Sequence, residues 1–486
     1  MEQKKTILDQ YPEYKVDIGI EVHVQLKTKS KIFCSCSNEQ VTEANVNICP
    51  TCSGYPGVLP VLNKEVVNNA IKAGLATNCS ISTKSTFARK HYFYPDLPKN
   101  YQITQDKKPI CSEGFLMIKG DNEEEKKIRI TRIHIEEDAG KNIHATGSNE
   151  SFVDLNRTGT PLLEIVSYPD IESAAEARSY LKTLRAIVIY IGATTGNMEE
   201  GSFRADKNIS VRKKNDPELG TRCELKNINS YKFISDAIEY EIERQIELLE
   251  SGEKVKQQTR LWDTKEKITL PMRSKEEAAD YRYFQDPDLP IIEVNEEWIK
   301  RVKAQLPELP QQKLKRLCEE HDVSVYEAEI LIEDPNLCDY YEKALQHTQS
   351  KNLINWVLRD IVTCIKENKK CPATCTVTPQ KLASIVDMVD DGKINIRAAQ
   401  EVFAQVSSTG EEPADIVKAK GLEQIGDTAE LEKIAKEIVD ANPDNVAAYK
   451  SGKDKLFGFF VGQAMKKTQG KGNPKIINEL LKKYLS

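Results

Sequence analysis

Long apolar runs are missing from this sequence. No stretch approaches the roughly 18 consecutive apolar residues that indicate a membrane-spanning helix. The first residues, MEQKKTILDQ, have neither the apolar core of a secretory signal nor the Arg- and Ser-rich, acid-poor character of a transit peptide. Repeats at solenoid or propeller periods are absent as well. We therefore expect a protein that is made and used in the cytoplasm and has no membrane partner.

A strong charge of one sign is also missing. The net charge is −6, from 69 Lys and Arg against 75 Asp and Glu. This balance argues against a protein that coats nucleic acid nonspecifically, but RNA binding needs only a local basic surface. Hydrophobic residues make up 39% of the 486 residues and charged residues 30%. Such values are typical of a folded chain with two to four domains.

A disulfide framework is not expected, because the 12 cysteines lie in a long chain without a secretion signal. Four of them form two short-spaced pairs, Cys34 with Cys36 and Cys49 with Cys52. Two such pairs, joined by a loop, supply the four thiolates of a tetrahedral zinc site. Protein ligands would fill every position, so the predicted Zn²⁺ is structural. The alternative is four reduced thiols in a loop.

The spacing of apolar residues changes twice along the chain, and this pattern predicts an α+β protein. Residues 1–294 hold alternating strands and turns, which predict a mostly antiparallel β-sheet cradle that carries the cysteine loop. Residues 295–406 have apolar positions at helical spacing within 325–331, 353–365 and 382–389. A polar stretch at 407–413 looks like a linker. Residues 407–486 then form a small helical tail.

Four predicted strands, at 16–26, 128–138, 204–212 and 222–226, each have one apolar and one polar face. In the second strand the apolar phase slips near Thr131, as a β-bulge would cause. Packed side by side, the strands would present a polar concave surface over a buried core. The alternative is a set of ordinary solvated faces. The polar faces carry Glu21, His23, Gln25, His134, Glu136, Asp138, Arg204, Asp206, Asn208, Arg222, Glu224 and Lys226.

Carboxylates with an imidazole on this surface are the ligands that suit Mg²⁺ or Mn²⁺. The candidate ligands are Glu21, His23, His134, Glu136, Glu137 and Asp138. Neither a P-loop nor a protein-kinase glycine loop is present. A bound nucleotide would therefore be held by the metal and by side chains. The candidate phosphate contacts are Lys90, Arg204, Arg222 and Lys226. The alternative is an ion-pair network that stiffens the sheet.

Longer motifs follow one another along the chain. They are IGIEVHVQL (18–26), SKIFCSC (30–36), CPTCSGYPGVLP (49–60), RKHYFYPDLP (89–98), IHIEEDAGK (133–141), DLNRTGTPLLEIVS (154–167), GNMEEGS (196–202), ELKNINS (224–230) and DYRYF (280–284). In this order they closely resemble the B subunits of the tRNA-dependent aspartyl/glutamyl amidotransferases. The resemblance spans almost the whole chain, and motifs of this length in one order are very specific.

The resemblance implies a ligase that uses ATP and glutamine. In this family the side-chain carboxylate of mischarged Glu-tRNA(Gln) or Asp-tRNA(Asn) is phosphorylated by ATP. Ammonia released by the amidase (A) subunit then passes through a tunnel and displaces phosphate, giving Gln-tRNA(Gln) or Asn-tRNA(Asn). A small C subunit completes the heterotrimer. Mg²⁺ or Mn²⁺ would neutralise charge on the transferred phosphoryl group.

The same resemblance assigns roles by motif. Glu21, His23 and one or both of Glu136 and Glu137 would hold the metal. Strand phase favours Glu136, so Glu137 would instead meet Lys90 where the tunnel ends. Further metal, ATP or substrate contacts are assigned to Glu224, Arg204, Asp206, Asn208, Arg222 and Lys226. One departure is Ala-Asp-Lys-Asn at 205–208, where the family often has Cys-Asp-Ala-Asn.

The last segment, 455–486, carries seven lysines against one acid, Glu479. A basic turn between two predicted helices suits the phosphate backbone of folded RNA. The segment resembles the YqeY-like helical domain that touches the tRNA body in this family. The alternative is a solvated lysine face. The predicted tRNA contacts are Lys466, Lys467, Lys471 and Lys475.

Other functions fit the sequence less well. A non-catalytic, zinc-stabilised tRNA-binding scaffold should have lost Glu21, His23 or the acidic run 136–138, and this chain keeps them. The archaeal-type E subunit carries a large insertion, whereas here Pro290 passes directly to Trp298 and the helices. A mitochondrial version would need a transit peptide. No amidase nucleophile motif is visible, so ammonia must come from a partner. The choice between Glu-tRNA and Asp-tRNA stays open.

Overall fold

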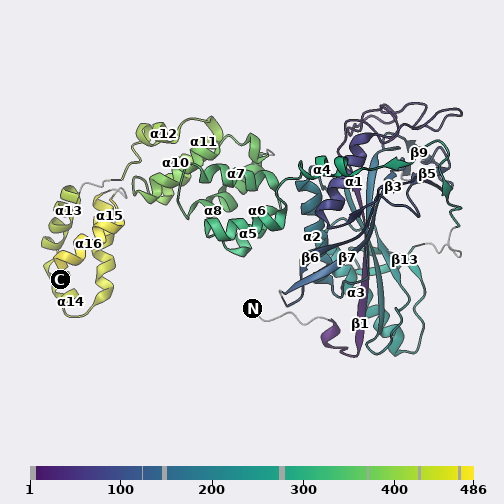
Figure 1. Ribbon diagram of the computed structural model, residues 1–486. Helices are drawn as coiled ribbons and strands as arrows, with labels where there is room; N and C mark the ends of the chain where they lie inside the picture. Colours follow the sequence, from purple (N-terminus) through teal and green to yellow (C-terminus); the bar gives the residue numbers. More distant parts are fainter. Residues whose placement is uncertain are drawn as a thin grey trace. The chain divides into compact units, whose positions relative to one another are not determined.

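The computed structural model forms two units, one up to Lys313 and one from Leu314 onward. The first unit is rich in β-structure and the second is helical (Figure 1). This is the mixed α+β organisation that the sequence predicts. The boundaries at 294 and 406 stay predictions. The described residues are 7–122, 124–144, 150–272, 280–368, 371–424, 428–468 and 472–485.

The first unit is built on a twisted sheet that, over the described residues, has nine strands in the order β14-β13-β12-β11-β1-β10-β7-β6-β2. Neighbouring strands are antiparallel except β12 and β13, which run parallel. The strands are β1 Tyr14–Gln25, β2 Ser80–Ile81, β6 Cys111–Lys119, β7 Glu125–Glu137, β10 Pro161–Ser167, β11 Phe203–Lys213, β12 Cys223–Lys226, β13 Gln258–Asp263 and β14 Ile268–Pro271.

Strand β1 lies in the middle of this sheet and pairs with β10 on one side and β11 on the other. Its predicted alternation is confirmed, because Val16, Ile18 and Val22 are completely buried. The predicted bulge in β7 is confirmed as well. Along β10, Val166 pairs with Arg132 and the next residue pairs with Ile130. Thr131 is therefore the extra residue, and it shifts the polar phase of β7.

Three helices cover the apolar face of the sheet. They are α1 Lys64–Ala76, α2 Ala174–Tyr190 and α3 Tyr231–Glu250, which contact β7, β6 and β11, respectively. Side-chain caps fix two of their starts, since Asn63 and Ser173 accept hydrogen bonds from the first turns of α1 and α2. The short helix α4, Glu296–Lys303, joins α1 through a hydrogen bond from Trp298 Nε1 to Asn68 Oδ1, 2.7 Å long.

A small sheet covers one end of the polar face. Its strands are β15 Phe284–Gln285, β4 Ala88–His91 and β5 Tyr101–Thr104, in that order. Strand β5 contacts β7. This cover makes His134, Glu136 and Asp138 almost completely buried, each about 5% exposed or less. The polar face is therefore not an ordinary solvated face. Two further pairs are β3 Lys84–Ser85 with β16 Ile292–Glu293, and β8 Lys141–His144 with β9 Ser151–Asp154.

The second unit begins within α5, Pro310–His321, and the three predicted helical segments are confirmed. The predicted linker at 407–413 is mostly wrong. Residues 407–409 end α11, and Pro413 begins α12, which leaves a break of only 410–412. Gly410 ends α11 in a left-handed conformation (φ 74°), which glycine adopts without strain. The remaining helices are α6 Val325–Ile332, α7 Pro335–Leu345, α8 Leu353–Trp356, α9 Val362–Asn368, α10 Pro379–Asp390, α11 Ile396–Thr409 and α12 Pro413–Lys420.

Four described α-helices from residue 428 onward share a core of their own, whereas α12 packs against α10 and α11. Leu431, Phe460 and Leu481, from three of these helices, are buried against one another. Among the helices described in both units, none has the length and apolar character needed to cross a membrane. The tail helices are α13 Thr428–Asp440, α14 Pro443–Lys450, α15 Phe457–Lys467 and α16 Pro474–Leu485.

Candidate functional site

Strand register brings two histidines and a glutamate into one row on the polar face. His23 of β1 lies opposite Glu164 of β10, and Glu164 lies opposite His134 of β7. Glu164 Oε2 is 3.3 Å from His23 Nε2 and 3.0 Å from His134 Nε2. Glu136 Oε1 completes the group, 3.3 Å from His23 Nε2. We call His23, His134, Glu136 and Glu164 the carboxylate–imidazole cluster.

The cluster joins residues that the sequence places far apart, and it includes one that our prediction missed. His23 and Glu136 were both predicted and do come together. Glu164 was not singled out, although it lies in one of the long motifs. The signal that could have found it was a single carboxylate in the otherwise apolar strand Pro-Leu-Leu-Glu-Ile-Val-Ser. A buried charge in such a strand needs a partner.

Opposite charges hold this cluster together. Burial disfavours the imidazolium of His23, but its hydrogen bonds to Glu136 and Glu164 outweigh this effect and raise the pKa of His23 to about 10. His134 behaves alike, and its pKa rises to about 9 against the effect of burial, chiefly through Glu164. Burial opposes ionisation of Glu136, but the two imidazoles lower its pKa to about 2. Two buried carboxylates are thus kept ionised by positive charge.

The donor set fits a divalent cation. His23 and the carboxylates of Glu136 and Glu164 each offer a ligand atom, and these atoms lie within 4.8 Å of one another. Both ring nitrogens of His134 are buried without a well-formed hydrogen bond, so the site is not satisfied by the protein alone. Two hard carboxylate oxygens suit Mg²⁺ or Mn²⁺, and the imidazole nitrogen of His23 can join them when the ion displaces its proton.

Glu21 lies at the edge of the cluster. It is on the same face as His23, two residues earlier in β1, and its Oε1 accepts a hydrogen bond of 3.1 Å from Asn208 Nδ2. Burial, followed by repulsion from Glu164 and Glu224, raises its pKa. Asn208, predicted as a substrate contact, thus positions Glu21. Glu21 is outside the group of closely spaced ligand atoms, so its role as a metal ligand stays a prediction.

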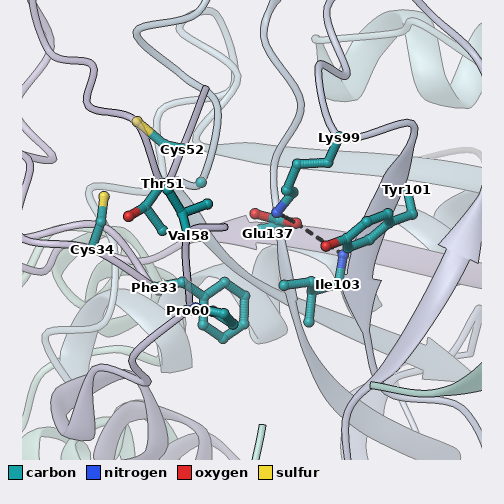
Figure 2. Close-up of a pocket in the computed structure, with 11 residues that line it drawn as sticks. Phe33, Cys34, Thr51, Cys52, Val58, Pro60, Lys99, Tyr101, Ile103 and Glu137 are labelled. Atoms are coloured by element: carbon teal, nitrogen blue, oxygen red, sulfur yellow. Dashed lines mark hydrogen bonds and ion pairs between the residues drawn. The ribbon is translucent and has the colours of Figure 1, made fainter. Parts of the chain in front are cut away.

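Glu137 points to a different place from Glu136. Its Oε1 accepts hydrogen bonds from the Ile103 amide, at 2.9 Å, and from Lys99 Nζ. Figure 2 shows this carboxylate in a small pocket between Tyr101 and the cysteine loop. Adjacent residues of a strand face opposite ways, and therefore Glu136 and Glu137 cannot serve one site.

The predicted partner of Glu137 was wrong. Glu137 meets Lys99 and not Lys90. The Lys90 ammonium instead lies over the ring of Tyr281, 4.8 Å from its centre. Lys90 and Lys99 flank the connection between β4 and β5, and sequence spacing alone did not tell which of them reaches back to β7. Lys90 Nζ also lies 6.0 Å from the ring centre of Tyr92.

Beyond the cluster, Asp138 gathers basic and amide groups. Its Oδ2 accepts hydrogen bonds of 2.9 Å from both Gln25 Nε2 and Arg204 Nη2, and Arg157 Nε lies 3.6 Å away. Arg204 Nε is buried without a hydrogen-bond partner. Gln25 and Arg157 also line a cavity of about 610 Å³. Its other lining residues include Lys27, Lys141, Thr160, Thr195 and Glu200.

On the other side of β1, the next strands form a second charged group. Lys226 Nζ lies 3.3 Å from Asp206 Oδ2 and 3.1 Å from Glu224 Oε1. The two carboxylates overcome the effect of burial and raise the pKa of Lys226. Thus Asp206, Glu224 and Lys226 come together as the strand pattern predicts. Arg222 is exposed and lies before β12 begins, so it is not part of this group.

The cysteine loop brings its four thiols together. The sulfurs of Cys34, Cys36, Cys49 and Cys52 lie within 4.8 Å of one another, and Cys49 and Cys52 are 3.8 Å apart. A tetrahedron with zinc–sulfur bonds of about 2.3 Å has edges of about 3.8 Å, so the geometry fits zinc. A hydrogen bond with Cys34 outweighs burial and, with Lys31 nearby, lowers the pKa of Cys52 to about 4.

The predicted tRNA contacts of the tail are largely exposed. Lys466 and Lys467 end α15, and Lys475 lies in the first turn of α16. Lys467 pairs with Glu437 of α13. Lys471 lies outside the described residues. The described lysines thus flank one connection between two helices, as the basic turn predicts.

Comparisons with known proteins agree over nearly the whole chain. Residues 16–300 match the family model described as the GatB/GatE catalytic domain, and residues 339–485 match the model described as the GatB domain. A protein of Geotalea daltonii, named as the B subunit of aspartyl/glutamyl-tRNA(Asn/Gln) amidotransferase, is 52% identical over 97% of this chain and 99% of its own length. Proteins of the same name from Brachyspira hyodysenteriae and Thermodesulfovibrio yellowstonii are 51% and 50% identical, over 98% and 97% of this chain and 100% and 99% of their own lengths. This chain therefore belongs to the aspartyl/glutamyl-tRNA amidotransferase B-subunit family.

Proposed function

We propose that this protein is the component that amidates mischarged tRNA in a glutamine-hydrolysing, ATP-dependent ligase. Its substrates would be Glu-tRNA(Gln), Asp-tRNA(Asn) or both, with ammonia supplied by an amidase (A) subunit and a small C subunit completing the complex. The observation that carries this proposal is the carboxylate–imidazole cluster, built by three neighbouring strands beneath a small covering sheet. Relatives that this chain matches over nearly their full length are named as B subunits of the enzyme that carries out this reaction.

We propose that His23, Glu136 and Glu164 hold Mg²⁺ or Mn²⁺, with Glu21 at the edge of the site. Their ligand atoms are close enough to share one ion. When bound, the ion neutralises charge on the transferred phosphoryl group. His134 contacts Glu164 and holds that carboxylate in place. Glu137, which meets Lys99, has a separate structural or gating role.

The reaction needs activation because a carboxylate is a poor electrophile. An oxygen of the substrate carboxylate would attack the γ-phosphorus of ATP, with ADP as the leaving group. Ammonia would then attack the carbonyl carbon of the acyl phosphate, release phosphate and lose a proton, leaving the amide. The cover of β4, β5 and β15 excludes water from this face, and exclusion of water protects an acyl phosphate from hydrolysis.

We propose that ATP binds beside Asp138, in the cavity of about 610 Å³. Cavities for small molecules span about 300–1,000 Å³. Arg157 lines this cavity and would contact the phosphates together with Arg204, which pairs with the same Asp138. Lys226 is not among the lining residues and would approach from the neighbouring strands. Asp206, Asn208 and Glu224 would shape the substrate end of the site.

Two further roles complete the proposal. The four cysteines hold a structural Zn²⁺, which fixes the loop against which the Glu137 pocket forms. The YqeY-like tail contacts the tRNA body through Lys466, Lys467, Lys471 and Lys475. The two proposed metal ions fit the two groups of closely spaced ligand atoms among the described residues.

The decisive experiment is reconstitution with the A and C partners. Conversion of Glu-tRNA(Gln) and Asp-tRNA(Asn) to their amides would be measured with glutamine and ATP, and again with each omitted. Amide formation that needs both supports the proposal and names the substrate. If the complex binds tRNA but forms no amide, this chain is a zinc-stabilised tRNA-binding scaffold instead.

A further inference from the structure

A group of exposed aromatic side chains borders the polar face. Phe93, Tyr94, Tyr283 and Phe284 are 69%, 53%, 43% and 50% exposed. Large side chains in such numbers are unusual on a solvated surface and mark an interaction site. Together with the half-buried Tyr92 and Tyr281 they form what we call the aromatic rim.

The rim is assembled from two distant segments. Tyr92, Phe93 and Tyr94 follow β4, whereas Tyr281, Tyr283 and Phe284 lead into β15. Pairing of β15 with β4 joins them, and the His91 amide donates a 2.9 Å hydrogen bond to the Tyr281 carbonyl. The rim is therefore held by backbone contacts that do not depend on the exposed rings.

Four of the rings form a continuous row. Tyr94 contacts Tyr92 with 6.4 Å between ring centres, Tyr92 contacts Tyr281 at 6.3 Å, and Tyr281 contacts Tyr283 at 6.0 Å. Phe284 lies beside this row and stacks on His91, with 5.0 Å between ring centres. A row of ring faces and edges is the arrangement on which successive unpaired bases stack.

Cations are interleaved with the rings. Lys90 Nζ lies 4.8 Å from the centre of Tyr281 and 6.0 Å from that of Tyr92. Among the described residues Lys90 has no carboxylate within ion-pair distance, so its charge is available to a phosphate. Arg89 lies 5.8 Å from the centre of Phe284, but Asp286 and Asp288 neutralise it. The rim thus combines much aromatic surface with little free charge.

The strands that carry the rim lead to the carboxylate–imidazole cluster. Gln285 of β15 pairs with Ala88 of β4, and Ala88 pairs with Thr104 of β5. Thr104 Oγ1 donates a hydrogen bond of 3.2 Å to Glu136 Oε2 of the cluster. The outer end of the row, at Tyr94, is exposed. The small sheet thus connects the exposed rings to the place where the side-chain carboxylate would react.

We propose that the aromatic rim stacks the unpaired 3′-terminal nucleotides of the aminoacyl-tRNA and so delivers the attached amino acid to the cluster. This inference rests on the proposed function. In an aminoacyl-tRNA the reacting side chain is attached to the last nucleotide, so the preceding unpaired bases must lie beside the site. Stacking on aromatic rings does not depend on which bases are present, so one rim can serve both tRNA substrates.

The test uses the reconstituted complex with its A and C partners. Binding would be measured for an intact tRNA and for the same tRNA lacking its three terminal nucleotides, with Phe93→Ala, Tyr94→Ala and Phe284→Ala. Loss of one base–ring stack weakens binding by about five- to a hundredfold. We expect this loss for intact tRNA alone, and no loss for the truncated tRNA. Tyr326→Ala, an exposed ring of α6, is the matched control and should bind both as the wild type does.

Phe93→Tyr and Phe284→Tyr keep the ring and should restore binding. Equal weakening for both tRNAs, or none for either, would overturn the proposal. Failure of the alanine variants to co-elute with the A or C partner would also overturn it, because the rim would then be a protein interface. A wild-type complex that forms no amide refutes the proposed function. If the wild-type complex forms amide normally and the alanine variants bind intact tRNA as the wild type does, only the role of the rim is refuted.

Discussion

Glu164→Gln removes one negative charge from the centre of the carboxylate–imidazole cluster and changes the shape of the side chain very little. Glu164 is the residue that our sequence prediction missed, and it touches both histidines through one oxygen. If the cluster binds the catalytic ion, the amide at this position should bind it poorly, because an amide oxygen carries no full charge. Amide formation should therefore fall sharply while tRNA binding is preserved.

The size of the effect follows from the contacts. Glu164 Oε2 lies 3.3 Å from His23 Nε2 and 3.0 Å from His134 Nε2. A hydrogen bond to a charged group contributes about 1.5–3 kcal/mol net, and only the contact with His23 is counted, because His134 lacks a well-formed hydrogen bond. Since about 1.4 kcal/mol changes a rate tenfold, we expect kcat/KM for amide formation to fall by about one to two orders of magnitude.

The assay is conversion of mischarged tRNA to its amide by the complex with the A and C partners, over a range of Mg²⁺ and Mn²⁺ concentrations. Added metal should restore part of the activity. The matched control is Glu176→Gln. Glu176 is also a buried glutamate, paired at 2.8 Å with Lys126 at the start of α2, but it lies away from the polar face. Loss of the Glu176 charge should lower the thermal stability of the protein and leave kcat for amide formation nearly unchanged.

Activity of Glu164→Gln within about threefold of the wild type, which is less than 1 kcal/mol, would refute the reasoning. So would an equal loss of activity in Glu176→Gln, since the effect would then come from a weakened fold. A variant that loses tRNA binding together with amidation would also contradict the assignment, because Glu164 would then act on the fold or on tRNA recognition and not on the ion.

The remaining predictions concern other parts of the chain. Cys49→Ser should reduce bound zinc, measured by metal analysis, and lower the midpoint of thermal unfolding; unchanged zinc content would exclude the thiolate site. Replacement of Lys466, Lys467 and Lys475 by glutamine should weaken tRNA binding. It should also reduce the slope of log affinity against log salt concentration by about 0.7–0.9 for each lost phosphate contact. A slope equal to that of the wild type would show that these lysines do not contact tRNA and form only a solvated surface. Glu137→Gln should loosen β5, measured by faster amide exchange at its Ile103 partner, with a smaller loss of amidation than Glu164→Gln; an equal loss would place Glu137 in the catalytic site.

The polar face could be predicted because the facing of side chains along a strand is a local property. In β1, the alternation of Ile18, Ile20 and Val22 with Glu21 and His23 identifies the buried face directly. The same holds for the bulge in β7, where a slip of the apolar phase marks the extra residue. The cluster of four cysteines could be predicted from spacing, since each short pair offers two thiols from one turn.

The membership of the site could not be predicted in this way. Whether Glu164 joins His23 and His134 depends on which residues of three strands lie opposite one another. That register pairs Glu164 with His23, 141 positions away, and with His134, 30 positions away. The partner of Glu137 depended on how the β4–β5 connection folds back on β7, which brings Lys99 to the carboxylate in place of Lys90.

Motif order and strand periodicity, which the sequence carries by itself, determined the family, the α+β organisation, the polar face of the first unit and the cysteine loop. Only the tertiary structure decided that Glu164 belongs to the cluster, that Glu136 and Glu137 serve different places, and that a small sheet buries the site. The reason is physical. Backbone geometry sets where a side chain points, whereas the group that it meets is set by the pairing of distant strands.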